Sequence, residues 1–287
     1  MTNAAYTLGT PVACTSCTVF ASPHSGRAYS KAFLRTSVLD QQTIRSSEDA
    51  FVDELISCAP HHGAQSISAT VPRAFVDLNR GPDELDPAVV NGLRRVTHNP
   101  RISSGLGVIP RVVANGRAIY RGKMTLAEAR TRLETYWHPY HDQLREMIDT
   151  TRNAFGQVVL VDMHSMPHEA IEGLNHTQAH RPDVILGDRF GAAASGHVVD
   201  HIEAAFRAVG LKVARNAPFA GAYIAQAYGR PSRNQHVVQV EIDRALYMDE
   251  TRVEPRPDFA AFQSTMSDVI AQISSFGRTS QTPLAAE

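Results

Sequence analysis

Short apolar segments alternate with amphipathic segments along this chain, and the alternation predicts an α/β architecture. Apolar segments of strand length cover residues 18–21, 66–71, 74–78, 158–163 and 237–242. The segment 158–163 is apolar nearly throughout, which is typical of a central parallel strand covered on both faces. The pattern therefore predicts a three-layer α/β/α fold with a mixed, mainly parallel central sheet.

The most regular amphipathic segment begins at Thr125. Thr125 and Glu128 form a Thr-x-x-Glu capping box, which marks the start of a helix. Apolar residues then recur every three or four positions, as expected for one buried helical face: Leu126, Ala129, Leu133, Trp137, Tyr140, Leu144 and Ile148. Pro139 is predicted to kink or break this helix. Further helices are predicted over residues 48–58, 197–209 (capped by Gly210) and 259–273.

The length and composition favour one domain. With 287 residues and 43% hydrophobic content, the chain can bury one large core. No internal repeat or long linker divides it. We therefore predict a single domain over 1–287, with its core at about 18–277 and loose segments at 1–16 and from 278 onward.

The charge distribution excludes several classes of partner. The net charge is −1, and the basic residues are spread thinly, so we predict no nucleic-acid partner. The first basic residue is Arg27, so a charged secretory n-region is missing. The longest apolar runs, such as 158–161, are far shorter than the roughly 20 residues that span a bilayer. We expect a soluble, cytoplasmic protein without membrane contact.

The cysteines do not form a disulfide framework. There are three, and Cys14 and Cys17 form a C-x-x-C. This pair could be half of a zinc site, with His24 the only further ligand nearby, or a redox pair, or two ordinary cysteines near a loose N-terminus. The last interpretation is favoured, because a structural zinc site needs four ligands.

Candidate reactive side chains follow the predicted strands, where open α/β sheets bind ligands. His24 follows the first strand and His164 ends the segment 158–163. The two imidazoles could share a metal, and Asp162 could orient His164. The chain has 13 histidines, so a hydrogen-bonded structural role is the alternative for each.

A carboxylate and two arginines add to this group. In the segment 237–242, Val238, Val240 and Ile242 face one way, so Glu241 faces the other. Glu241 is either a functional carboxylate or a solvent-facing strand residue. Arg73 and Arg80 suit an anionic substrate, because guanidinium binds carboxylate through two hydrogen bonds. Pairing of these arginines with Asp77 or Asp83 at the surface is the alternative.

An ordered set of short motifs resembles the N-formylglutamate amidohydrolase family, a distant relative of zinc carboxypeptidases and aspartoacylase. The motifs are Ser-Pro-His-Ser-Gly at 22–26, Val-Asp-Leu-Asn-Arg at 76–80, Tyr-Trp-His-Pro-Tyr-His at 136–141, Asp-Met-His-Ser at 162–165, Gly-Ala-Tyr-Ile at 221–224, Tyr-Gly-Arg-Pro at 228–231, Gln-Val-Glu-Ile at 239–242 and Tyr-Met-Asp-Glu at 247–250. They cover the chain from about residue 18 to 255.

The resemblance implies a metal site and a hydrolytic mechanism. It implies Zn²⁺, or another divalent metal, held by His24 and His164, with Asp49 as third ligand and Glu48 or Asp53 as its rivals. Such a set leaves a coordination position open for catalysis. By the same resemblance Glu241 is the general base, Arg73 steadies the oxyanion, and Asn79 with Arg80 holds a substrate carboxylate.

The implied substrate is a small N-acyl amino acid, above all N-formyl-L-glutamate, cleaved to formate and the free amino acid as in histidine degradation. Tyr223 and Gln226 are further substrate-binding candidates. Gln226 and Ala227 replace an Arg-His pair that is usual in the family, which places glutamate as the amino acid in doubt. A carboxypeptidase-like peptidase is an alternative, although its usual Glu is Arg27 here. The second alternative is a non-catalytic protein of the same fold that binds a metal or an amino acid.

Overall fold

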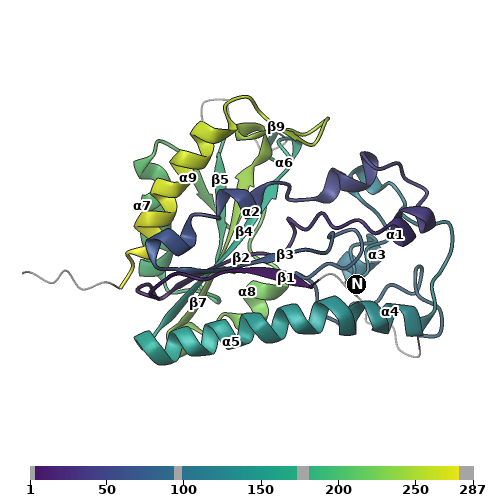
Figure 1. Cartoon of the computed structure of the whole chain (residues 1–287), viewed down its shortest axis with the longest axis horizontal. Coiled ribbons are helices and arrows are strands. Elements are labelled where there is room, and N and C mark those ends of the chain that lie inside the picture. The colour runs from purple at the N-terminus through teal and green to yellow at the C-terminus, as the bar shows by residue number, and fades with distance from the viewer. Residues whose placement is uncertain (1–3, 94–98, 173–180, 278–287) are drawn as a thin grey trace, which may run out of the picture.

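A mixed seven-stranded sheet forms the centre of the structure, a computed structural model that describes residues 4–93, 99–172 and 181–277 (Figure 1). The strands are ordered β1-β3-β2-β4-β7-β5-β6. Their bounds are β1 Tyr6–Gly9, β2 Thr18–Ser22, β3 Gln65–Ala69, β4 Val158–Met166, β5 Val184–Gly187, β6 Val213–Arg215 and β7 Gln235–Asp243. The four central strands β3, β2, β4 and β7 run parallel, whereas β1 and β5 pair antiparallel with their neighbours β3 and β7. The predicted mixed, mainly parallel sheet is confirmed.

The N-terminal segment was predicted to be loose, and for residues 6–9 this is wrong. They form the edge strand β1, paired with β3 from Tyr6↔Ala69 to Gly9↔Ser66. Only four residues long and half exposed, β1 carries too weak an apolar pattern to be recognised as a strand. The predicted loose tail from residue 278 lies outside the described residues.

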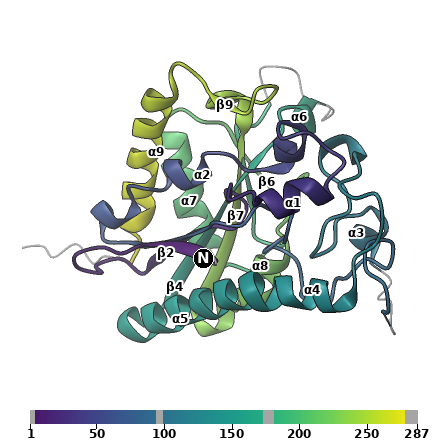
Figure 2. The ribbon, with the colours of Figure 1, turned by 45° about the vertical axis from the view of Figure 1, so that its right-hand side comes forward.

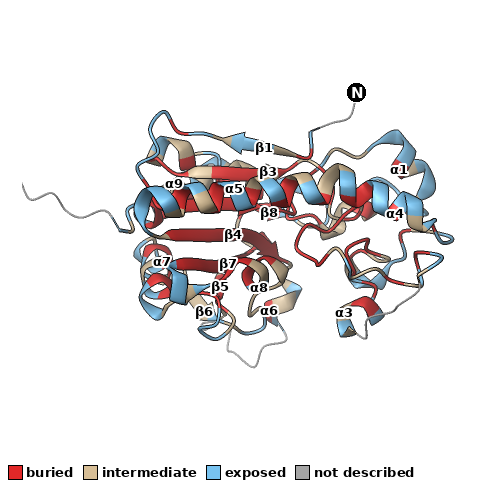
Figure 3. Ribbon diagram, turned by 90° about the horizontal axis from the view of Figure 1, so that it is seen from below, coloured by how far each residue is buried: buried red, intermediate tan, exposed pale blue. Residues whose placement is uncertain are grey.

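Helices cover both faces of the sheet (Figures 1 and 3). On one face lie α2 (Val52–Leu55), α7 (Gly196–Ala208) and α9 (Phe259–Ser274), packed against Val159 and Val161 of β4. On the other lie α5 (His138–Phe155) and α8 (Tyr223–Tyr228), packed against Val158 and Leu160. Successive side chains of a strand point to opposite faces, so β4 serves both core clusters. All residues of β4 and β7 are buried, as Figure 3 shows in red.

The predicted long helix forms, and Pro139 changes its winding. Thr125 caps α4 (Leu126–Arg132) by accepting a hydrogen bond from the Glu128 backbone N–H at 3.1 Å. A π-helical turn, η4 (Leu133–Trp137), then joins α4 to α5 just before Pro139. Proline has no N–H to donate to the preceding turn, and the wider π turn accommodates that loss without ending the helix.

Gly210 ends α7 as predicted. Its φ of +87° is left-handed, and two backbone bonds close the helix: Gly210 N–H to Arg207 O at 3.0 Å and Leu211 N–H to Phe206 O at 3.2 Å. This pair is the Schellman motif, which favours glycine because a side chain would be strained there.

Two predicted elements differ from the structure. Residues 74–78 form no strand: the backbone turns at Pro72, whose carbonyl accepts from Phe75 and Val76. Their apolar side chains are buried against the face covered by α5, so the apolar pattern reports burial and not strand pairing. The helix expected over 48–58 shrinks to α2, because Glu48 and Asp49 are extended or turn residues and Phe51 adopts a left-handed φ of 65°.

The remaining elements lie mostly in long connections. They are α1 Lys31–Thr36, η1 Thr43–Ser47, η2 Ala59–His62, α3 Pro100–Ser103, η3 Ala114–Gly116, α6 Glu169–Glu172, η6 Pro231–Arg233, η7 Arg244–Leu246 and the hairpin β8 Met248–Asp249 with β9 Glu254–Pro255. The α1 and α3 segments lie on the opposite side of the molecule from α7 and α9 (Figure 2). Within the described residues, no helix is long and apolar enough to cross a membrane.

Candidate functional site

The site begins at the carboxyl end of β2. His24 lies two residues after the end of this strand and is 2% exposed. Gly26 lies so close to the carbonyl of Val71 that an added Cβ would overlap the carbonyl oxygen. The turn that holds His24 therefore requires glycine at 26, and it keeps the imidazole below the surface.

The neighbouring parallel strands bring His164 and Glu241 to the same edge. β4 pairs in parallel with β2 and β7, and His164 lies opposite Glu241 in the β4–β7 register. The carboxyl ends of parallel strands meet at one edge of a sheet, which is where such folds bind ligands. Alternation along β7 turns Glu241 away from the core residues Val238 and Val240, as predicted.

Asp49 comes from the connection between η1 and α2. Its backbone N–H donates to the His24 carbonyl at 3.1 Å, which ties this connection to the β2 turn. One carboxylate oxygen, Oδ1, accepts from Arg244 Nη2 at 3.0 Å. The other, Oδ2, faces the two histidines. Asp49 is 1% exposed, so its charge is neutralised inside the protein.

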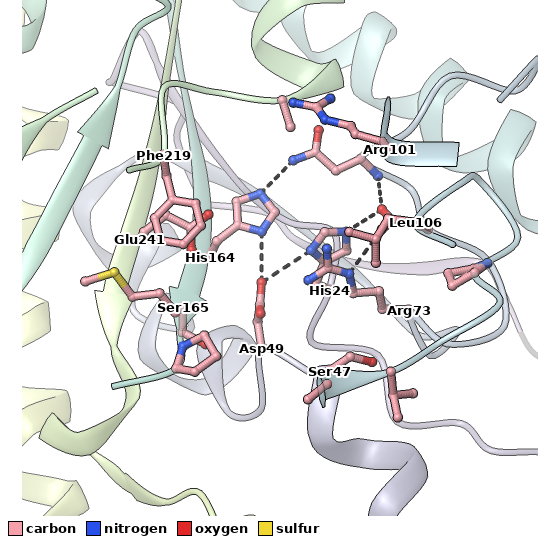
Figure 4. Close-up of a pocket in the computed structure, with 18 of the residues that line it drawn as sticks. His24, Ser47, Asp49, Arg73, Arg101, Leu106, His164, Ser165, Phe219 and Glu241 are labelled. Carbon is pink, nitrogen blue, oxygen red and sulfur yellow. Dashed lines mark hydrogen bonds and ion pairs between the residues drawn. The ribbon is translucent and has the colours of Figure 1, made fainter. Parts of the chain in front are cut away.

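Three ligand atoms converge at this point (Figure 4). Asp49 Oδ2 lies 2.8 Å from His164 Nδ1 and 3.4 Å from His24 Nδ1, and ligand atoms of the three residues all lie within 4.8 Å of one another. Within the described part of the chain, His24 Nδ1 has no hydrogen-bond partner although it is buried. A buried nitrogen without a partner, facing a carboxylate and a second imidazole, fits a divalent metal ion.

Carboxylates hold the far side of both rings. His24 Nε2 contacts Asp77 Oδ1 at 2.6 Å, and His164 Nε2 contacts Asp162 Oδ2 at 3.1 Å. Asn79 Nδ2 donates to the same Asp162 oxygen at 3.2 Å. Asn79 Nδ2 also lies 3.0 Å from His164 Nε2. In the tautomer with the proton on Nε2, each ring would donate to its carboxylate and direct its Nδ1 lone pair at the cluster. This outer set of partners is typical of metal-binding histidines.

The charges inside the cluster depend on one another. Burial opposes ionisation of Asp49, but its interactions with the neighbouring His164 and His24 hold its pKa well below the usual value. Burial likewise disfavours a charged His164, yet Asp162 and Asp49 raise its pKa well above the usual value. The structure thus places positive charge between these carboxylates, the position that a cation would take.

Glu241 is a buried carboxylate beside the cluster. It is 8% exposed, and its Oε1 accepts from Gln239 Nε2 at 2.8 Å. Burial raises its pKa to about 7, and His164 and Arg73 oppose this rise. A carboxyl group that exchanges its proton near neutral pH is suited to general acid–base work.

A cavity of about 570 Å³ opens onto these groups, which is within the usual size of a small-molecule site. His24, Asp49, His164 and Glu241 all line it. So do four arginines: Arg73, Arg80, Arg101 and Arg244. Its outer wall comes from the connection after β3, with Leu106, Pro110, Val112, Val113, Asn115 and Gly116. Figure 4 shows several of these residues around the cavity.

The rivals of Asp49 point elsewhere. Glu48 Oε1 accepts from Arg45 Nε at 2.8 Å, and Asp53 pairs with Arg27 at 2.9 Å. Cys14 is exposed and Cys17 is buried with its Sγ 3.3 Å from Phe276 O. The metal-ligating cluster found within the described residues is His24, Asp49 and His164, and it includes no cysteine.

Two predicted substrate-binding residues are not part of the described cavity lining, Tyr223 and Gln226, both on α8. The Tyr223 ring packs against Trp137 and His141, and Gln226 is exposed. The residues before α8, Pro218 to Ala222, do line the cavity.

Several residues of the site carried no clear signal in the sequence. Asp77 was considered only as a surface partner for arginine, yet it is 2% exposed and binds both His24 and Arg73. Arg244 and Arg101 lie in connections without a repeating pattern. Gln239 could have been found, because it shares the polar face of β7 with Glu241.

Comparison with known proteins identifies the family. The family model for N-formylglutamate amidohydrolase matches residues 16–248. The chain belongs to the N-formylglutamate amidohydrolase family. The resemblance inferred from the motifs is thereby confirmed, as is the predicted enzyme class, a hydrolase acting on amides.

Individual members of the family agree. The chain is 29% identical to an N-formylglutamate deformylase of Pseudomonas putida over 236 residues, which is 80% of each chain. It is 29% identical to one of Pseudomonas aeruginosa over 266 residues, covering 89% of this chain and 92% of that protein. The crystal structure of N-formylglutamate amidohydrolase from Ralstonia eutropha is 34% identical, with a TM-score of 0.89 over 96% of this chain and 99% of that one.

Proposed function

We propose that this enzyme is a zinc-dependent deformylase that cleaves the formamide C–N bond of N-formyl-L-glutamate, giving formate and L-glutamate. The convergence of His24 Nδ1, Asp49 Oδ2 and His164 Nδ1 on one cavity with Glu241 carries this proposal. The relatives named N-formylglutamate deformylase support the substrate. A cytoplasmic enzyme of histidine degradation is the corresponding cellular role.

His24, Asp49 and His164 are the residues that would hold the metal. Two imidazoles and one carboxylate suit zinc and leave a coordination position open. When bound, the metal supplies Lewis-acid chemistry that polarises the formyl carbonyl. Asp77 and Asp162 keep the two rings in the orientation that directs Nδ1 at the cluster.

Glu241 carries the proton through the reaction. It takes a proton from the attacking water and gives it to the leaving nitrogen, which departs as the α-amino group of the product. Its buried position raises its pKa to about 7, which suits both transfers. The Gln239 side chain fixes this carboxylate by donating from its Nε2 to Glu241 Oε1. Gln239 is itself held in place, because its own Oε1 accepts from the Ala222 N–H at 2.8 Å.

Arg73 and Arg80 supply positive charge for the substrate. Arg73 uses its Nε for Asp77 at 3.1 Å, so its terminal nitrogens are available for a developing oxyanion. Arg80 binds the α-carboxylate. The amide of Asn79 is committed, because its Oδ1 accepts from the Ile224 N–H at 2.8 Å and its Nδ2 donates to Asp162. Asn79 therefore positions Asp162 and α8 instead of binding substrate.

The Glu241→Gln variant tests the proposal. With zinc supplied, we expect wild-type protein to release formate from N-formyl-L-glutamate, and the variant to do so about 10²–10⁴-fold more slowly. Its zinc content and melting temperature should match those of the wild type. Glu134→Gln, at an exposed helical position, should behave as wild type. A fully active Glu241→Gln, or zinc-loaded wild-type enzyme that releases no formate, would refute the proposal.

A further inference from the structure

The four arginines that line the cavity are not equivalent. Arg73 pairs with Asp77 at 3.1 Å, and Arg244 pairs with Asp49 at 3.0 Å. Arg80 and Arg101 have no acidic partner among the residues that the structure describes. The cavity therefore contains two guanidinium groups that form no direct ion pair within the described residues, although Asp77 and Glu84 lie near enough to act on Arg80 through their charge.

Within the described residues, Arg80 donates its hydrogen bonds to backbone oxygens. Its Nε donates to Leu106 O at 3.0 Å and its Nη1 to Asn79 O at 2.8 Å, and the residue is 7% exposed. Burial lowers its pKa, Asp77 and Glu84 oppose this shift, and the positive charges of Arg73 and Arg101 add to it. Arg80 and Arg101 therefore lie close enough to repel each other, a cost that bound anions would relieve.

Arg101 is presented by a well-anchored turn. It lies on α3, whose Asn99 side chain accepts from the Arg101 backbone N–H at 2.9 Å. Asn99 Nδ2 in turn donates to Glu84 Oε2 at 3.0 Å, and Ile102 is buried. The other oxygen of Glu84 accepts from the Gly81 N–H at 2.9 Å, and Glu84 forms no ion pair with Arg101 within the described residues. The backbone is thus fixed while the half-buried guanidinium faces the cavity (Figure 4).

The next arginine of the same connection shows the contrast. Arg111 Nε pairs with Asp86 at 2.9 Å, and its Nη2 donates to Ser103 O at 3.1 Å, so it braces α3 from outside the cavity. Arg111 thus has a structural role. Arg101 forms no ion pair within the described residues and faces the cavity, as a ligand-binding group would.

We propose that Arg101 binds the side-chain carboxylate of an acidic N-formyl amino acid while Arg80 binds its α-carboxylate, so that Arg101 selects glutamate over neutral amino acids. This inference rests on the proposed deformylase activity. It also removes the difficulty raised by Gln226: that position is exposed and outside the described lining of the cavity, so its lack of charge does not deprive this site of a cation.

The test compares two substrates that differ by one charge. For N-formyl-L-glutamate and the neutral, similarly shaped N-formyl-L-glutamine, kcat/KM is measured on zinc-loaded wild type, Arg101→Ala and Arg101→Lys. Wild type should prefer the glutamate substrate. In Arg101→Ala, kcat/KM for N-formyl-L-glutamate should fall by roughly 10- to 100-fold, the usual effect of losing one charged hydrogen bond. For the glutamine substrate, kcat/KM should fall by less than about threefold. Arg101→Lys should recover part of the preference.

Two further measurements separate substrate binding from structural effects. Calorimetry with the products should show that Arg101→Ala weakens the binding of L-glutamate and leaves the affinity for L-glutamine unchanged. Arg145→Ala, at an exposed position of α5 outside the cavity lining, should leave activity on both substrates unchanged. A wild type without preference for glutamate, or equal losses on both substrates in Arg101→Ala, would overturn the inference while leaving the deformylase activity intact. A wild type that hydrolyses neither substrate would remove both.

Discussion

Replacing Asp77 with asparagine tests how the site is held without changing any of the proposed metal ligands. The Asp77 carboxylate is buried and accepts from three donors: His24 Nε2 at 2.6 Å, the Asn79 N–H at 2.8 Å and Arg73 Nε at 3.1 Å. Burial opposes its ionisation, yet the charges of His24, Arg73 and Arg80 hold its pKa well below the usual value, so it is ionised at neutral pH. Asparagine keeps the shape and removes the charge.

The structure gives the size of the effect. One amide oxygen can still accept from His24 and Asn79, but the amide nitrogen then faces Arg73 Nε, donor to donor. Loss of the carboxylate behind a metal-binding histidine typically weakens metal affinity by about 10- to 100-fold. That range corresponds to about 1.4–2.7 kcal/mol. Because Arg73 loses its carboxylate partner in this variant, the free energy of unfolding should fall by about 1.5–3 kcal/mol.

Zinc affinity is measured by competition with a chromogenic chelator, and stability by urea unfolding of the metal-free protein. Asp86→Asn is the matched control, because Asp86 is equally buried and pairs with Arg111 at 2.9 Å but contacts no histidine. It should lose stability and keep its zinc affinity. Equal zinc affinity in Asp77→Asn and wild type would refute the role given to Asp77.

Three further predictions concern the framework of the site. Gly26→Ala should destabilise the fold and weaken zinc binding, because the added Cβ meets the Val71 carbonyl. Gly122→Ala, with open space around it, should change the free energy of unfolding by less than about 0.5 kcal/mol. Equal melting temperatures of the two variants would contradict this prediction. Burial lowers the pKa of His141 to about 4 from 6.5. The unfolded state then binds more protons between these values, so the free energy of unfolding falls as pH drops through this window, by about 3 kcal/mol for this group. Denaturant unfolding at pH 7 and pH 4 should show a smaller fall in the free energy of unfolding for His141→Gln than for wild type. An equal fall in both proteins would disprove the role given to His141. Leu144→Ala, fully buried on α5, should cost about 2–5 kcal/mol in urea unfolding, and a change below 1 kcal/mol would contradict the packing described.

The parts of the fold that repeat a simple pattern could be predicted from the sequence. The alternation along β7 placed Glu241 on the face opposite Val238 and Val240, and the apolar run before His164 marked a central strand. The same reasoning failed for residues 74–78. Side chains buried from a turn and side chains buried from a strand give the same apolar pattern, and only the backbone hydrogen bonds distinguish them.

The rest of the site depends on contacts between distant segments. Asp49 reaches His164 across 115 positions of the chain, and Arg244 reaches Asp49 across 195. No local periodicity encodes such contacts, so Asp49 was named only through the family resemblance and Arg244 was missed. Arg101 was missed for a related reason: its significance lies in having no acidic partner within the described structure, which is a property of the folded cavity.

The most direct test of a zinc-dependent deformylase is a titration of activity against metal. Protein freed of metal by chelation receives increasing amounts of zinc, and the rate of formate release from N-formyl-L-glutamate is followed. If His24, Asp49 and His164 hold the catalytic metal, activity starts near zero, rises in proportion to the zinc added and levels off at about one zinc per chain. Full activity before any zinc is added, or none after the site is filled, would contradict the account.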